Sequence, residues 1–254
     1  MILGDNGMEY IINIIGIGEY GKEILKALNE NEYTRLVEER KNPFKTFVDD
    51  LKLVDISLII RKRYFDENTD YSIEGNSWFN FIIYDNKDRI LAANVAKNIK
   101  YVEYLNLGLC INGCDSVDLI KTIKVGRDDV HDIILNMLQP ILCLPGMVGY
   151  DQIDIYNFFN TDCRYEILNF NGEKNDLNFQ MDDILLSMNK FKDEKIQLMP
   201  ILTTQKPWTL TYQLEFFQKI WDLEYVNVID NTTWLLYFIY YLNKDILTLI
   251  CKVK

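Results

Sequence analysis

The chain has 254 residues, enough for one large domain or for two smaller domains with cores of their own. Apolar residues make up 48% of it, a composition that argues against intrinsic disorder. The formal net charge of −11 repels phosphate backbones and anionic lipids, so nucleic acids and membrane surfaces are disfavoured as partners.

The cysteines and the apolar stretches indicate where the protein is located. The five cysteines are odd in number and irregular in spacing, as in a cytoplasmic protein with reduced thiols. No charged-then-apolar signal peptide opens the chain. The stretch "WLLYFIYYL" at 234–242 is much shorter than the roughly 20 apolar residues of a membrane span. We therefore predict a core helix at 234–243, no membrane span and a cytoplasmic location.

The predicted elements alternate between strand and helix along the chain. Before the middle of the chain we predict strands at 10–17, 54–60, 78–85 and 104–112, a helix after Gly21, a helix within 87–101 and a charged loop at 61–77. After it we predict strands at 164–170, 196–202, 224–230 and 246–253, and helices at 178–191, 209–223 and 234–243.

The amphipathic segment 128–144 divides these two halves as a core helix. Alternation of strand and helix predicts an α/β protein with a parallel sheet. We expect a nucleotide-binding-like domain at 1–145, which includes the core helix, and a smaller C-terminal α/β domain at 146–254.

The first motif is the glycine turn "IIGIGEYG", in which an apolar strand is followed by Gly16, Gly18, Gly21 and a helix. Such a turn lets a phosphate approach the backbone and the N–H groups of the helix N-terminus. The alternative is a tight turn without a ligand. A dinucleotide site also needs a strand that ends in an acidic residue about 20 residues further on. Glu38 and Glu39 lie at that distance, but no clear strand precedes them, so a Rossmann-type site is less favoured.

The second motif is "LPGMVGYDQIDIYNFF" at 144–159, where Asp151 and Asp154 follow the core helix. Two carboxylates three residues apart on a turn can polarise a water molecule or hold a cation. The alternative is a helix start, in which Asp151 is the N-cap and Asp154 follows in the first turn.

The segment "GMVGYDQID" resembles a loop of the tubulin/FtsZ superfamily with the form Gly-Leu-Ile-Asn-x-Asp-Phe-Ala-Asp. Gly146 and Met147 match its start, and Asp151 and Asp154 match its acidic positions. The glycine turn resembles the first phosphate loop of that family, and "AANVAKNIKYVEYLNLGLCIN" resembles a later helix and strand. The resemblance covers much of residues 10–159.

This resemblance implies GTP or GDP with Mg²⁺ as ligands and assembly with further copies of the chain or with another protein. It implies that Asp151 and Asp154 act as catalytic residues on the nucleotide of a neighbouring subunit. The residues that it places around phosphate are Gly16, Gly18, Glu19, Tyr20, Gly21 and Lys22.

The glycine-rich Gly-Gly-Gly-Thr-Gly-Thr-Gly loop of the family is absent. After Ile60, where we expect it, the chain has "RKRYFDENTD". Arg61, Lys62 and Arg63 would then lie at the carboxyl end of a strand, where their charge could replace the loop and bind phosphate. The alternative is a solvated loop whose charges pair with its own acidic residues. A single histidine, His131, rules out a histidine-rich metal site, and we predict no resident metal site.

We therefore expect a divergent tubulin/FtsZ-like protein that self-associates or binds another protein, with GTP binding and with weak or absent hydrolysis. One alternative is a non-catalytic interaction module whose nucleotide site has decayed. Another is a Rossmann-type dinucleotide-binding protein.

Overall fold

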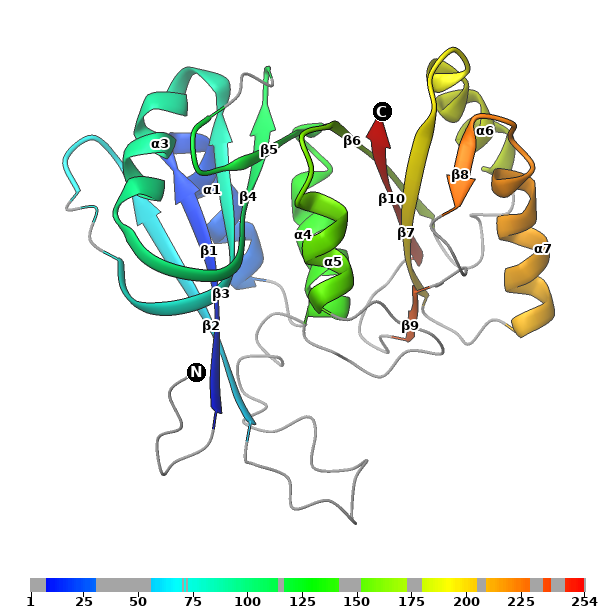
Figure 1. Cartoon of the computed structure of the whole chain (residues 1–254). Helices are drawn as coiled ribbons and strands as arrows, with labels where there is room; N and C mark the ends of the chain where they lie inside the picture. Colours follow the sequence, from blue (N-terminus) through cyan, green and yellow to red (C-terminus); the bar gives the residue numbers. More distant parts are fainter. Residues whose placement is uncertain are drawn as a thin grey trace. The chain divides into compact units, whose positions relative to one another are not determined.

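The computed structural model describes residues 8–30, 56–69, 71, 73–113, 117–141, 152–172, 180–204, 209–228, 235–238 and 245–253 (Figure 1). The chain divides into two compact units, Met1–Lys124 and Val125–Lys254. Both units combine β-strands with α-helices, which confirms the predicted α/β class.

The first unit is a parallel sheet with strand order β2-β1-β3-β4-β5. Its elements are β1 (Met8–Ile17), α1 (Gly18–Glu30), β2 (Ile56–Phe65), β3 (Ile73–Asp85), the 3-10 turn η1 (Asn86–Asp88), α3 (Arg89–Lys97), β4 (Ile99–Ile111) and β5 (Lys121–Lys124). Strand β1 lies between β2 and β3. After β1 the chain forms β2 on one side of it and then β3 on the other side, so the strand order reverses at β1. In parallel α/β sheets, ligands bind at the carboxyl ends of the strands where the order reverses.

Helices cover both faces of this sheet. On one face, Gly16 of β1 lies directly against Gly21 and Leu25 of α1. On the other face, Ile15 and Ile17 of β1 share a core cluster with α3. Because both faces are covered, β1 is an isoleucine-rich buried strand, as its sequence predicts.

A row of asparagines crosses the first sheet. Asn13 of β1, Asn80 of β3 and Asn106 of β4 are in register. Asn13 donates to Asn80 over 2.6 Å, and Asn80 donates to Asn106 over 2.7 Å. Asn106 in turn donates to the carbonyl of Leu119 over 3.0 Å. A shift of one strand would separate these side chains, so the row favours a single register.

The second unit is a mixed sheet in which β10 lies between β6 and β7 and runs antiparallel to both. Its elements are α4 (Val130–Ile141), α5 (Gln152–Phe159), β6 (Arg164–Gly172), α6 (Met181–Met188), the 3-10 turn η3 (Asn189–Phe191), β7 (Ile196–Thr204), α7 (Leu210–Trp221), β8 (Val226–Val228), β9 (Leu235–Phe238) and β10 (Asp245–Val253). Strands β8 and β9 both pair with β7 in parallel.

Helix α4 is the core helix that the sequence predicts at 128–144. It packs against β7 and β10 and therefore belongs to the second unit, whereas the division at residue 145 placed it in the first. Its Asn136 is 1% exposed and bonds to both strands. Residues 142–151 lie outside the described part of the chain.

Two predictions of secondary structure are wrong. The segment 61–77 is not one loop, because β2 continues to Phe65 and β3 begins at Ile73. The aromatic segment 234–243 contains a strand, β9, where we predict a helix. Aromatic and branched residues suit a strand as well as a helix, and pairing with β7 decides for the strand. Residues 239–244 lie outside the described residues.

Candidate functional site

The β1–α1 turn has the backbone geometry of an anion-binding turn. Gly18 has a φ of +66°, a conformation that favours glycine, and it is the first residue of α1. The N–H groups of the first helical turn have no partners within the helix and carry a partial positive charge. A Cβ atom on Gly16 would lie 2.5 Å from the carbonyl oxygen of Gly21, so these two glycines let the strand and the helix pack closely.

The other residues predicted around phosphate differ in exposure. Glu19 and Lys22 are exposed, and their side chains lie 3.9 Å apart. The Lys22 ammonium lies 5.6 Å from the centroid of the Tyr64 ring, on β2. Tyr20 is only 4% exposed and packs in the interior. The surface of the turn is therefore formed by Gly18, Glu19 and Lys22.

Asp88 is a residue of this turn that the sequence reasoning missed. It ends the η1 connection between β3 and α3, and a Cβ atom on Gly18 would overlap its carboxylate oxygen Oδ2. Oδ2 is buried and makes no hydrogen bond. Burial is the largest cause that raises the pKa of Asp88 above its usual value, and the negative charges of Asp85 and Glu67 add to it, against Lys87. The β3–α3 connection thus places a desolvated carboxylate oxygen directly against Gly18.

The end of β4 holds this connection in place. Asp85 Oδ1 accepts from the backbone N–H of Lys87 over 3.2 Å, and its Oδ2 accepts from the side chain of Asn112 over 2.9 Å. The side chain of Asn86 packs against Gly113, where a Cβ atom would lie 2.5 Å from its Nδ2. The β3–α3 connection that carries Asp88 is therefore held by hydrogen bonds of Asp85.

Arg61, Lys62 and Arg63 are not in a loop, which corrects the prediction. They lie within β2 and pair with Asn13, Ile14 and Ile15 of β1. Because side chains alternate between the faces of a sheet, Lys62 lies on the opposite face from Arg61 and Arg63. The three residues cannot converge on one phosphate as a loop would allow, and the part of each in binding stays a prediction.

The acidic pair is described only in part. Asp154 lies in the first turn of α5, whereas Asp151 lies outside the described residues. The C-terminal end of α5 is held by Tyr165 of β6, whose hydroxyl donates to the carbonyl of Phe158 over 2.7 Å. Burial raises the pKa of Tyr165 to about 12, so this donor keeps its proton at neutral pH.

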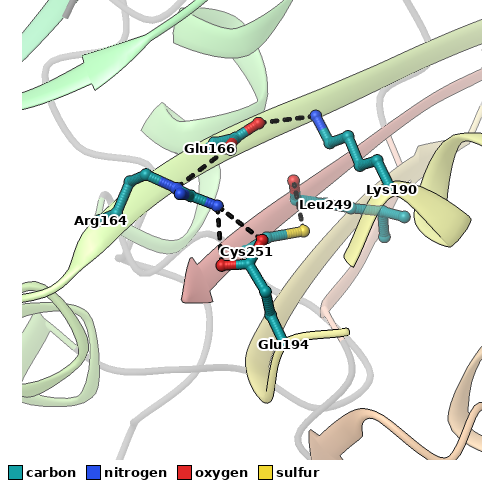
Figure 2. Close-up of polar contacts among 6 residues, drawn as sticks. All are labelled: Arg164, Glu166, Lys190, Glu194, Leu249 and Cys251. Carbon is teal, nitrogen blue, oxygen red and sulfur yellow. Dashed lines mark hydrogen bonds and ion pairs between the residues drawn. The ribbon is translucent and has the colours of Figure 1, made fainter. Parts of the chain in front are cut away.

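A second polar cluster connects β6, η3 and the following turn of the second unit (Figure 2). Arg164 contacts Glu194 at 2.8 Å and Glu166 at 3.2 Å, and Lys190 contacts Glu166 at 2.7 Å. Cys251 of β10 lies beside this network and is fully buried. Burial raises the pKa of its thiol to about 12, so Cys251 is not a thiolate nucleophile at neutral pH.

Among the described residues, no three or more His, Cys, Asp or Glu side chains are grouped to hold a metal ion. Within the same residues, none of the helices combines the length and the apolarity needed to cross a membrane. His131 lies 3.3 Å from its neighbour Asp132 at the start of α4.

Comparisons with known proteins identify the fold. No protein-family model matches the chain. None of the curated proteins matches it. Among solved structures, a single-residue mutant of FtsZ from M. jannaschii matches with a TM-score of 0.60 and 10% sequence identity. The match covers 97% of this chain and 91% of that chain. The protein therefore has an FtsZ-like α/β fold.

An FtsZ-like fold raises the question of whether this turn fits a nucleotide phosphate. Gly18 has a positive φ at the start of α1, as glycine turns that bind phosphate can have, but the Asp88 carboxylate lies directly against it. Burial is the largest cause that raises the pKa of Tyr64, and the negative charges of Asp66, Glu19 and Asp88 add to it, so further negative charge lies near the turn. In this conformation, the side chains at the turn do not fit a phosphate.

Proposed function

We propose that this chain is a tubulin/FtsZ-like protein that self-associates, binds GTP weakly at the β1–α1 turn, and hydrolyses it slowly or not at all. The observation that carries the proposal is the likeness to FtsZ over 97% of the chain. Gly18, at the start of α1 and with a positive φ, supports the place of the nucleotide. Asp88 and the missing glycine-rich loop are the reasons for weak binding.

Asp154 is the residue that tests the catalytic part of this proposal. In the proposed assembly, Asp151 and Asp154 of one subunit act on the nucleotide of the next subunit. Alanine at position 154 is therefore expected to abolish any GTP turnover and to leave GTP binding unchanged. Phosphate release and GTP titration, each measured on the wild type and on Asp154→Ala, give the two quantities.

The matched control is Asp162→Ala, because Asp162 is an exposed carboxylate just beyond the same helix. This control is expected to keep wild-type turnover and binding. If Asp154→Ala loses GTP binding as strongly as it loses GTP turnover, Asp154 does not act on the nucleotide of a neighbouring subunit. A residue with that role does not hold the nucleotide of its own subunit.

A non-catalytic interaction module is the second candidate, and the position of Asp88 against Gly18 favours it. Such a module would bind its partner with or without GTP. A dinucleotide-binding protein is less favoured. Asp66 does follow β2, but its Oδ1 accepts from Asn68 N and Thr69 Oγ1 in a local turn. A nicotinamide absorbance in the purified protein would nevertheless favour that alternative.

A further inference from the structure

Asp88 stands at the N-cap position of α3, yet it does not cap that helix. An aspartate at this position usually accepts a hydrogen bond from the first turn of the helix, which stabilises the helix. The Asp88 side chain makes no such bond, and its Oδ2 has no hydrogen-bond partner at all. The carboxylate lies instead against Gly18, on a different element of the sheet edge.

This position carries an energetic penalty. A buried oxygen without a hydrogen bond loses its interactions with water and gains none in return. The charges near Asp88 do not remove that penalty, since Asp85 and Glu67 oppose its ionisation and only Lys87 favours it. Arrangements of this kind persist where the surrounding structure imposes them. Here the backbone that carries Asp88 is held by the hydrogen bonds that Asp85 accepts from Lys87 and Asn112.

Asp88 also lies against the glycine backbone that an incoming phosphate would approach. Phosphates bind at such turns because glycine lets them approach the backbone and the free N–H groups of the helix. The heavy atoms nearest to the position of a Cβ on Gly18 are Oδ2 and Cγ of Asp88. A phosphate and this carboxylate are both anions, so they compete for the same space and repel each other.

We propose that Asp88 is the residue that sets the anion affinity of the β1–α1 turn, by acting as a built-in competitor of the nucleotide phosphate. This inference rests on the proposed function, because it concerns the same site. The β3–α3 connection holds an anionic side chain against the glycine turn. A nucleotide enters only when the Asp88 carboxylate is displaced or neutralised.

The test is GTP binding by calorimetry to the full chain carrying Asp88→Asn. Asparagine keeps the size and the capping ability of aspartate and removes only the charge. We expect GTP to bind at least about tenfold more tightly than to the wild type. A tenfold change corresponds to about 1.4 kcal/mol, which lies within the range of the repulsion between neighbouring like charges at a protein surface. Asp88→Ser, which keeps a capping side chain, is a second variant and is expected to act in the same direction.

The matched control is Asp118→Asn, which changes the net charge by the same amount at an exposed turn of the same unit. It is expected to bind GTP as the wild type does. If the wild type binds GTP and both Asp88 variants bind it equally or less tightly, Asp88 is not a competitor and the proposed function stands. If neither the wild type nor the variants bind GTP at millimolar concentration, both this inference and the nucleotide part of the proposed function fail.

Discussion

At the residue scale, the pKa of Asp88 gives a prediction that needs no ligand. Its folded-state pKa is raised above the usual value of 3.8, chiefly by burial, so the folded protein binds the proton more tightly than the unfolded chain. The ionised group therefore destabilises the folded state at neutral pH. That penalty is relieved as the pH falls through the folded-state pKa toward 3.8.

Asp88→Asn is accordingly expected to raise the melting temperature at pH 7, and this gain should shrink as the pH approaches 4. Thermal unfolding of the wild type and the variant at several pH values measures the difference. The groups that act on Asp88 are Asp85 and Lys87 on its own connection and Glu67 beyond β2, and they are common to both proteins. A gain that does not change with pH would mean that charge is not its cause.

The glycine turn was visible in the sequence, whereas Asp88 was not. Gly16, Gly18 and Gly21 carry a local pattern that indicates a strand-to-helix turn by itself. Asp88 reaches that turn only because β3 pairs with β1, which is a contact between residues distant in the sequence. In the sequence, Asp88 is only an aspartate that precedes a helical pattern. That pattern indicates an N-cap and gives no indication of a contact with Gly18.

At the element scale, Asn136 connects α4 to the sheet of the second unit. Its Nδ2 lies 2.8 Å from Thr248 Oγ1 of β10 and 3.1 Å from the carbonyl oxygen of Ile201 of β7. Its Oδ1 accepts a hydrogen bond from Thr203. All of these groups are buried, so removal of the amide leaves several polar atoms without partners.

Asn136→Ala is therefore expected to lower the free energy of unfolding by about 2–4 kcal/mol. The control is Asn157→Ala, an exposed asparagine of α5, which should change it by less than about 0.5 kcal/mol. Urea unfolding followed by circular dichroism measures both. Equal midpoints for the two variants would show that the buried amide does not hold α4 on the sheet.

The sequence predicts most elements of this chain, and the errors have physical causes. Apolar periodicity locates β1, α4, β7 and α7 within a few residues. It fails for the end of β2, because Arg61 and Arg63 look like loop residues until pairing with β1 makes them part of a strand. It also fails at β9, where an aromatic run fits both a helix and a strand. In both segments, pairing with a strand distant in the sequence determines the secondary structure.

At the scale of the whole molecule, the fold defines the architecture, whereas the chemistry depends on the side chains of the site. An FtsZ-like fold at 10% identity shows the architecture and leaves the chemistry to be argued from side chains. The side chains at the β1–α1 turn are mostly acidic, and Asp88 is the one in contact with Gly18. The molecule thus combines a glycine turn between β1 and α1 with acidic side chains around it.

The proposed protein self-associates and binds GTP, and sedimentation velocity measures whether the two are coupled. The wild-type protein is measured over a range of concentrations, without nucleotide, with millimolar GDP and with millimolar GTP and Mg²⁺. We expect oligomers that grow with protein concentration and are favoured by GTP over GDP. A monomer under every condition would contradict the proposed self-association.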